Sequence, residues 1–187
     1  MRAMPITRSR SGLLQRWLVP GLLGLTLLIA DQFSKLWVVA TLGPEPYQRA
    51  INLSGAWLRF VYARNTGIAF GLFPSLAQIF IVTSMLITAG ALYAYVYHLP
   101  NEKPAMQIAI GLIAGGALGN ISDRLRLGYV VDFISVGWWP VFNLADSSVT
   151  VGVTILAIYL MLASDPPPHP APQDDGLLRD LLNREVK

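Results

Sequence analysis

The chain has 187 residues, of which 53% are hydrophobic and only 13% are charged, and its mean hydropathy is +0.49. A soluble domain carries about 25% charged residues, so this chain lacks the polar surface of a water-soluble protein and is expected to be an integral membrane protein. It contains no cysteine, which excludes disulfides, a thiolate nucleophile and a cysteine-ligated metal. The net charge of +3 gives no sign of nucleic-acid binding, because the basic residues gather toward the ends of the chain.

Four apolar stretches come close to the ~20 residues that are needed to cross the core of a bilayer. They run from about Trp17 to Leu42, from Leu76 to Leu99, from Ala105 to about Asn120, and from Ser147 to Ala163. The first follows an arginine-rich start, as in a signal peptide, but its apolar run is too long and no small-residue cleavage site follows. We therefore interpret it as a retained anchor and expect an all-α membrane protein with four transmembrane helices.

Charges beside the first stretch predict how the chain is oriented. Four arginines and no acidic residue precede it, which favours a cytoplasmic N-terminus, and an even number of spans returns the C-terminus to the same side. The expected organisation is a cytoplasmic tail at 1–16, a transmembrane domain at 17–163 with outer loops 43–75 and 121–146, and a Pro-rich, disordered cytoplasmic tail at 164–187. Five arginines near the outer loops do not fit this orientation, and we interpret them as functional exceptions: Arg49, Arg59, Arg64, Arg124 and Arg126.

Two segments of the outer loops have the composition of short strands. Leu53–Ala63 and Tyr129–Val136 are rich in β-branched and aromatic residues. A small sheet at the membrane surface would place Trp57, Trp138 and Trp139 at the level of the lipid headgroups, where tryptophan is enriched.

Polar residues interrupt the first apolar stretch in the sequence DQFSK at 31–35. Asp31 and Lys35 are four residues apart, so on a helix they face the same side and can neutralise each other inside the bundle. Two interpretations remain open, a structural ion pair and direct participation in substrate binding.

The segment NTGIAFG at 65–71 follows the first predicted strand region. Asn65 offers hydrogen-bond donors and an acceptor, and Gly67 and Gly71 permit tight turns. Taken alone, this pattern favours a structural turn over a functional site.

The third stretch combines a glycine pattern with a polar end. Asn120, Asp123 and Arg124 are spaced to share one helix face at the outer membrane boundary, either as a positioned site or as an Asp–Arg pair that ends the helix. Before them, small residues recur every four positions, which lets transmembrane helices approach closely: Gly111, Gly115 and Gly119.

Asp132 and Asp146 bound the short segment DFISVGWWPVFNLAD between two apolar stretches. A carboxylate at membrane depth is unfavourable unless it is paired or functional. Asp146 precedes the fourth stretch and could be an ordinary helix N-cap, favoured by the helix dipole. Asp132 follows two valines in an extended stretch and has no such explanation.

Two carboxyl groups brought together share a proton, so that one is an acid while the other is ionised. The anion could take a proton from water as that water attacks an amide carbonyl, while the acid polarises the carbonyl oxygen. The spacing of the two aspartates alone leaves this chemistry and the structural interpretation equally open.

The motifs DQFSK, NTGIAFG, GGALGNISDR, VVDF and FNLAD occur in this order on the four-span layout. Together they resemble lipoprotein signal peptidase (signal peptidase II), over about residues 20 to 163. The resemblance implies a bacterial inner-membrane aspartic endopeptidase that removes the signal peptide from prolipoproteins, just before a diacylglyceryl-modified cysteine. It also implies four transmembrane helices with a small extracytoplasmic β-cradle and a short periplasmic helix.

Matched motif by motif, the resemblance makes Asp132 of VVDF and Asp146 of FNLAD the catalytic pair. Asp31 and Lys35 match the first-helix motif, and we expect them to be structural. The segment between the two aspartates is a few residues shorter than is usual in the family, which affects the shape of the cradle there. The family's supporting polar residues match five positions of this chain: Asn65, Asn120, Asp123, Arg124 and Asn143.

No metal or organic cofactor is expected, because His98 and His169 are isolated in the sequence from the acidic motifs. The expected partners are lipid-modified prolipoproteins and membrane lipids, and not nucleic acid. We expect a monomer in the bacterial inner (cytoplasmic) membrane, with both termini in the cytoplasm and the active site near the outer leaflet.

Two other classes of protein also hold carboxylates in a membrane. A proton- or cation-coupled small membrane transporter would usually place them near the bilayer midplane and show internal repeats, and the sequence shows neither. A non-catalytic bundle subunit would use Asp–Lys and Asp–Arg pairs for assembly only, which leaves Asp132 without a purpose.

Overall fold

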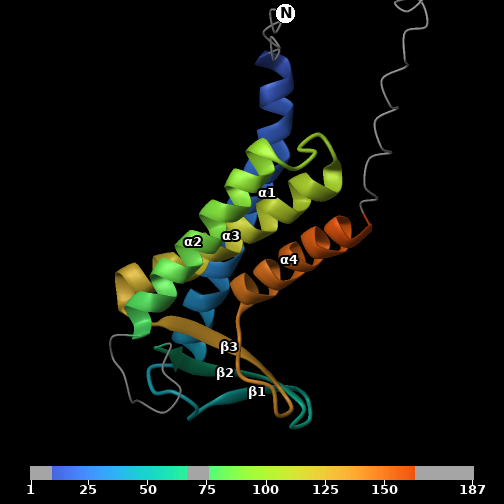
Figure 1. Cartoon of the computed structure of the whole chain (residues 1–187). Helices are drawn as coiled ribbons and strands as arrows, with labels where there is room; N and C mark the ends of the chain where they lie inside the picture. The colour runs from blue at the N-terminus through green and yellow to red at the C-terminus, as the bar shows by residue number, and fades with distance from the viewer. Residues whose placement is uncertain (1–9, 67–75, 163–187) are drawn as a thin grey trace, which may run out of the picture.

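The structure is a computed structural model, and it describes residues 10–66 and 76–162 (Figure 1). Its helices in these ranges are α1 Arg10–Leu42, α2 Leu76–Tyr97, α3 Pro104–Leu127 and α4 Leu144–Leu162. Its strands, β1 Ala50–Ser54, β2 Leu58–Asn65 and β3 Val130–Val136, form an antiparallel sheet in the order β1-β2-β3. The sheet lies at one end of the helices, near the end of α1 and the start of α4 (Figure 1).

Three helices are long and apolar enough to cross a membrane: Arg16–Leu42 within α1, all of α3, and all of α4. In the most apolar 18 residues of the α1 span and of the α4 span, only 17% of the residues are buried inside the protein. Apolar side chains on the outside of a helix bundle are expected where the surroundings are lipid. The second predicted span corresponds to α2, which has 22 residues.

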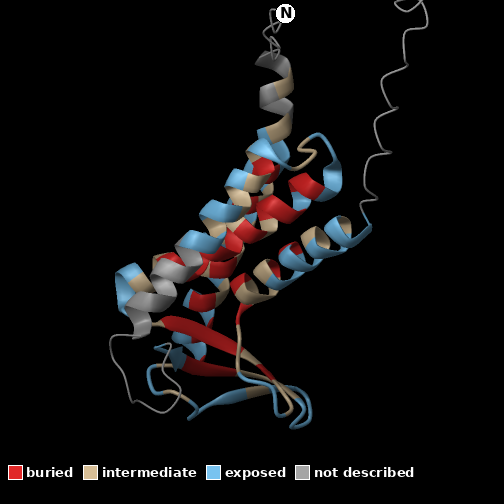
Figure 2. Cartoon of the chain, viewed as in Figure 1, coloured by how far each residue is buried: buried red, intermediate tan, exposed pale blue. Residues whose placement is uncertain are grey.

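α3 is the central helix, and glycines allow its neighbours to approach it. A Cβ atom on Gly115 would lie 2.6 Å from the carbonyl oxygen of Gly24 on α1, and one on Gly116 would lie 2.5 Å from that of Ala145 on α4. Gly111 similarly faces the backbone of Pro20. These contacts confirm the close helix packing predicted from the glycine pattern, and Figure 2 shows buried residues concentrated along α3 and β3.

α3 continues seven residues past the predicted end of the apolar stretch, to Leu127. It ends at Gly128, whose positive φ of 79° and N–H bond to Arg124 O form a left-handed cap that suits glycine. α4 likewise begins before the predicted Ser147, at Leu144. Asp123, Arg124 and Asp146 lie within the predicted outer loop 121–146, and they are helical, as their spacing and position suggested.

The predicted strand region Leu53–Ala63 is two strands, because Gly55 (φ 55°) turns the chain between β1 and β2. β2 pairs with β3 and shifts its register between Phe60 and Ala63, so that Ala63 lies opposite Asp132. Side chains on one face of the sheet pack against the end of α1, in a core of Val38, Leu42, Tyr62, Val131 and Phe133. Since side chains alternate along a strand, Asp132 points to the opposite face from its neighbours Val131 and Phe133.

Candidate active site

Asp132 is buried on β3, with 2% of its surface exposed. Both of its carboxylate oxygens accept hydrogen bonds from amides: Oδ2 from Asn65 Nδ2 at 2.8 Å and Oδ1 from Asn143 Nδ2 at 2.6 Å. Asn65 is the last residue of β2, and Asn143 is the residue just before α4. The two amides fix the carboxylate where the sheet meets the helices.

Asp146 lies in the first turn of α4, as predicted, but Asn143 caps the helix. Asn143 Oδ1 accepts the N–H of Asp146 at 2.9 Å, and Asp146 Oδ2 accepts the N–H of Asn143 at 3.2 Å. This reciprocal pair is a capping box, which satisfies two backbone donors at the helix start. The other carboxylate oxygen of Asp146 accepts a bond from Asn120 Nδ2 at 2.7 Å.

Two amides connect the two aspartates. Asn143 Nδ2, which binds Asp132, lies 3.1 Å from Asn120 Oδ1, and the Nδ2 of the same Asn120 binds Asp146. The four side chains form one hydrogen-bonded row from β3 to α4 through α3. The structure thus brings together two carboxylates that are fourteen residues apart in the sequence.

Burial raises the pKa of the Asp132 carboxyl to about 6. The hydrogen bond from Asn65 opposes this rise, whereas the negative charge of Asp146 adds to it. A carboxyl group with a pKa near 6 can both give up and take up a proton near neutral pH, which is what acid–base chemistry requires.

A second buried network lies behind this row. Lys35 Nζ contacts Asp31 Oδ2 at 2.7 Å, so the predicted pair is present, and it also contacts Asp123 Oδ2 at 2.9 Å. Asp123 therefore faces α1, and its ion pair is with Lys35 rather than with Arg124. Gln32 joins the network through Nε2, which lies 3.0 Å from Asp123 Oδ1. We did not predict a role for Gln32, although a polar residue within an apolar stretch was a usable signal.

Two cavities reach the aspartates from different sides. The first, of about 230 Å³, lies between α2, α3 and α4 and is lined by Asn120, Arg124 and Asp146 together with apolar and threonine side chains. Arg124 Nε is buried there without a hydrogen-bond partner in the described part of the chain. The second cavity, of about 380 Å³, lies beside the sheet and is lined by Asp132 and eight further residues: Tyr47, Ala63, Arg64, Asn65, Thr66, Trp139, Pro140 and Val141.

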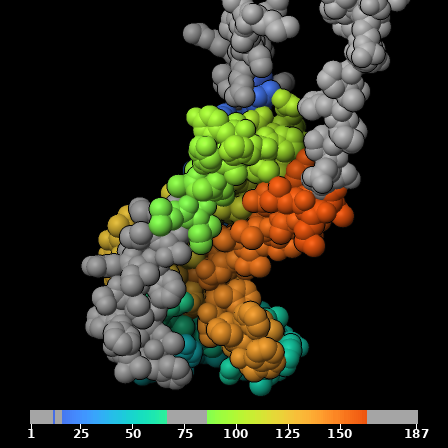
Figure 3. All heavy atoms as spheres, in the orientation of Figure 1, coloured from blue at the N-terminus to red at the C-terminus, as the bar shows by residue number. Residues whose placement is uncertain are grey.

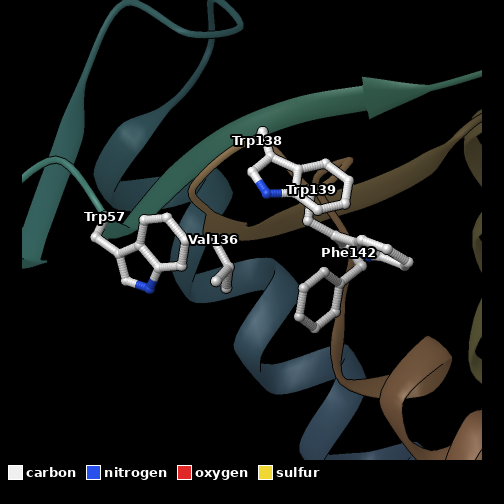
Figure 4. A pocket seen from close by; sticks show the side chains of 5 residues that line it. All are labelled: Trp57, Val136, Trp138, Trp139 and Phe142. Atoms are coloured by element: carbon white, nitrogen blue, oxygen red, sulfur yellow. The ribbon is translucent and has the colours of Figure 1, made fainter.

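Aromatic side chains form a third, apolar hollow of about 340 Å³ on the sheet (Figure 4). It is lined by Trp57, Trp138, Trp139, Val136 and Phe142, and Trp138 is 82% exposed. The turns that carry these residues are joined, because the N–H of Gly137 donates to Trp57 O at 2.7 Å. In Figure 3 the loops of the sheet form a lobe at the end of the bundle, below α4.

The remaining site predictions concern glycines and metal ligands. Gly67 and Gly71 lie outside the described residues. Gly119 lies against the Asp31 carboxylate, since a Cβ there would be 2.5 Å from Asp31 Oδ2. Within residues 10–66 and 76–162, no group of three or more His, Cys, Asp or Glu side chains could hold a metal ion.

Comparison with known proteins gives consistent matches. A family model described as signal peptidase (SPase) II matches residues 23–162. A lipoprotein signal peptidase of Moorella thermoacetica is 41% identical over 141 residues, covering 75% of this chain and 91% of that protein. One of Syntrophomonas wolfei is 42% identical and covers 74% and 89% of the two chains. A solved structure described as a bacterial membrane enzyme superposes with a TM-score of 0.69 at 31% identity, over 78% of this chain and 94% of the other.

Proposed function

The chain belongs to the signal peptidase II family, and on that premise we propose that it cuts its substrates with Asp132 and Asp146, hereafter the catalytic pair. It is a membrane protease that removes signal peptides from prolipoproteins. The observation that carries the proposed mechanism is the row of two amides, which holds both carboxylates in one hydrogen-bonded unit.

In this mechanism the two carboxyls begin the reaction in different states. Asp132 carries the shared proton, because burial raises its pKa to about 6 and the second negative charge adds to that rise. Asp146 is the anion, because its oxygens accept bonds from Asn120 and from a backbone N–H at the start of α4.

A water molecule between the pair supplies the nucleophile. Asp146 takes one proton from this water while the water oxygen forms a bond to the scissile carbonyl carbon. At the same time Asp132 gives its proton to the carbonyl oxygen. In the resulting tetrahedral intermediate, Asp146 passes its proton to the amide nitrogen and the C–N bond breaks. Asp132 recovers a proton from the intermediate as the new carboxyl group forms, so the pair returns to its starting state.

Arg124 has the properties of a substrate-binding residue. Its buried Nε has no hydrogen-bond partner among residues 10–66 and 76–162, and it lines the cavity that also contains Asp146. Because a guanidinium carries five N–H donors and cannot lose its proton in a protein, it can bind peptide carbonyl oxygens beside the scissile bond. The apolar wall of the same cavity, which includes Ile113 and Val149, suits a substrate that enters from the lipid.

The same proposal extends to the membrane topology and to the position of the cut in the substrate. We infer that α2 completes four transmembrane helices, with both termini in the cytoplasm and the catalytic pair near the outer leaflet of the bacterial inner membrane. The exposed tryptophans on the sheet support that depth, because tryptophan favours the membrane interface. The enzyme acts as a monomer without a metal or organic cofactor, and it cuts before a diacylglyceryl-modified cysteine.

A cleavage assay tests the proposal. The purified protein in detergent should shorten a lipid-modified prolipoprotein on a gel, with and without a metal chelator. Asp132→Asn and Asp146→Asn should each abolish this shift, while Glu45→Gln, which alters an exposed carboxylate in the same outer region, should not. Cleavage by either Asn variant would refute the catalytic pair, and the absence of any proteolysis would favour a transporter.

A further inference from the structure

Two buried carboxylates outside the catalytic pair bind the backbone directly beside it. Asp31 Oδ1 accepts the N–H of Ala145 at 3.0 Å, and Ala145 precedes the catalytic aspartate of α4. Asp123 Oδ2 accepts the N–H of Val131 at 3.1 Å, and Val131 precedes the catalytic aspartate of β3. The residue just before each catalytic aspartate therefore donates its backbone N–H to a carboxylate from a different element, α1 or α3.

Lys35 connects these two contacts. Its Nζ lies 2.7 Å from Asp31 Oδ2, 2.9 Å from Asp123 Oδ2 and 3.1 Å from Asn120 Oδ1. An ammonium has three N–H donors, and here each has an acceptor. Only 4% of the lysine side chain is exposed, so it has neither a donor nor a free surface for the substrate.

The contact with Asn120 also determines which way that amide points. Asn120 Oδ1 accepts bonds from Lys35 and from Asn143 Nδ2, which leaves Nδ2 of Asn120 to face Asp146 at 2.7 Å. If the amide were flipped, its oxygen would face a carboxylate and its NH₂ group would face two donors. The ammonium thus favours the one orientation in which Asn120 connects the two halves of the catalytic pair.

We propose that Lys35 is the positioning residue of the catalytic pair, in addition to balancing charge inside the bundle. It sets the separation of β3 and α4 through Asp31 and Asp123, and it orients the bridging amide of Asn120. The inference rests on the proposed function, because it assumes that Asp132 and Asp146 perform the cleavage.

Loss of the ammonium has two effects that experiments can separate. The first is a loss of folding, because Lys35→Met leaves two carboxylates buried side by side without a counter-ion. The second is misplacement of the catalytic pair, which persists even if the charge is rebalanced by a second change, Asp123→Asn. In that double variant one buried carboxylate remains, and the oxygen of the new asparagine can still accept the N–H of Val131.

The experiment compares Lys35→Met and Lys35→Met/Asp123→Asn with the native protein, measuring folded yield, kcat and KM on folded, purified enzyme. We expect the double variant to recover folded yield but to keep a kcat lowered by about a hundredfold, as displacements near 1 Å can produce. KM should stay within about twofold. Ile110→Ala is the matched control: Ile110 is buried on the same helix as Asn120, about 15 Å along its axis, and its loss should lower stability without changing kcat.

The pH profile gives a second readout that a simple loss of folding does not move. The charge of Lys35 lowers the pKa of Asp132. Because Asp132 must be protonated in the proposed mechanism, removal of that charge should shift the alkaline limb of kcat/KM to higher pH. Several charged and titratable groups surround this network besides the catalytic pair. The helices contribute Asp31 from α1 and Asp123, Arg124 and Arg126 from α3. The sheet contributes Tyr62 and Arg64 from β2 and Tyr129, which precedes β3. All except the substituted residues are unchanged in the variants.

The outcomes separate this proposal from the one on which it rests. If kcat and the pH profile of the double variant return to native values together with folding, Lys35 is structural only and the positioning role is refuted. If Asp132→Asn retains cleavage, the catalytic pair itself is refuted. A low kcat with a displaced alkaline limb in the double variant, beside a normal kcat in Ile110→Ala, supports the positioning role.

Discussion

Replacing Asp132 by asparagine should make the protein inactive without making it less stable at neutral pH. The carboxylate accepts hydrogen bonds from Asn65 Nδ2 and Asn143 Nδ2. Asparagine keeps one acceptor oxygen and places an NH₂ group against the other donor, so one bond is lost, at about 1–3 kcal/mol. The substitution also removes a buried negative charge, and the burial of that charge destabilises the native protein.

The size of that second effect follows from the pKa. Burial raises the pKa of Asp132 from 3.8 to about 6, which corresponds to about 3 kcal/mol. Between these two pH values the folded protein binds more protons than the unfolded chain, so native stability falls as the pH rises. The asparagine variant lacks this fall. It should be less stable than the native protein near pH 4 and equal or up to about 2 kcal/mol more stable above pH 7.

Thermal unfolding in detergent, followed by the fluorescence of the five tryptophans, measures this difference. The melting temperature of Asp132→Asn minus that of the native protein should rise by roughly 6–12 °C between pH 4 and pH 7.5. Glu45→Gln, at an exposed position, is the matched control for the loss of a carboxylate. A constant difference for Asp132→Asn would refute the argument, because it would mean that this carboxyl does not titrate near pH 6.

Three further predictions concern the pair, the helix packing and the tail. Asp146→Asn should abolish cleavage. The double variant with Asp132→Asn should be scarcely slower than either single variant, because the effects of coupled residues on activity are not additive. A kcat of the double variant that falls by the product of the two single losses would contradict this. Gly116→Ala should lower melting temperature and activity, since its Cβ would lie 2.5 Å from a backbone oxygen of α4. At Gly90 a Cβ would meet no other described part of the chain within 4 Å, so Gly90→Ala should be neutral or stabilising by about 0.5–1 kcal/mol. Equal melting temperatures for the two variants would count against the packing argument. Truncation after Ser164 should leave insertion and cleavage intact on a gel, and a chain that inserts but does not cleave would show that the polar tail is needed.

The sequence was most informative where a residue type is unusual for its surroundings. Asp132 and Asp146 stood out because carboxylates beside apolar stretches are rare, and the family that their motifs resemble is confirmed. Asp31 and Lys35 are paired as their spacing predicted. Each of these signals is local, because it depends on residue type and on distances of a few residues along one element.

What escaped prediction depends on how separate elements are rotated against one another. Asp123 pairs with Lys35 across two helices rather than with its neighbour Arg124, and no sequence spacing shows which face of α3 meets α1. Asp31 binds a backbone N–H of α4, and backbone groups leave no trace in residue type. The spacing of Asn120, Asp123 and Arg124 predicted that they share a helix face, as they do in α3. The end of that helix was not predicted, because polarity marks the edge of the apolar core, whereas the helix ends only at Gly128.

The network behind the catalytic pair also has a consequence for how the enzyme is made. Lys35 and Asn120 are 85 residues apart, and Asp31 and Ala145 are 114 residues apart. Translation therefore completes the first membrane helix long before the ribosome reaches the last one. The proposed catalytic geometry is complete only after α4 has been synthesised and has docked on α1 and α3. On that proposal, a nascent chain stalled before that point holds no working protease in the membrane.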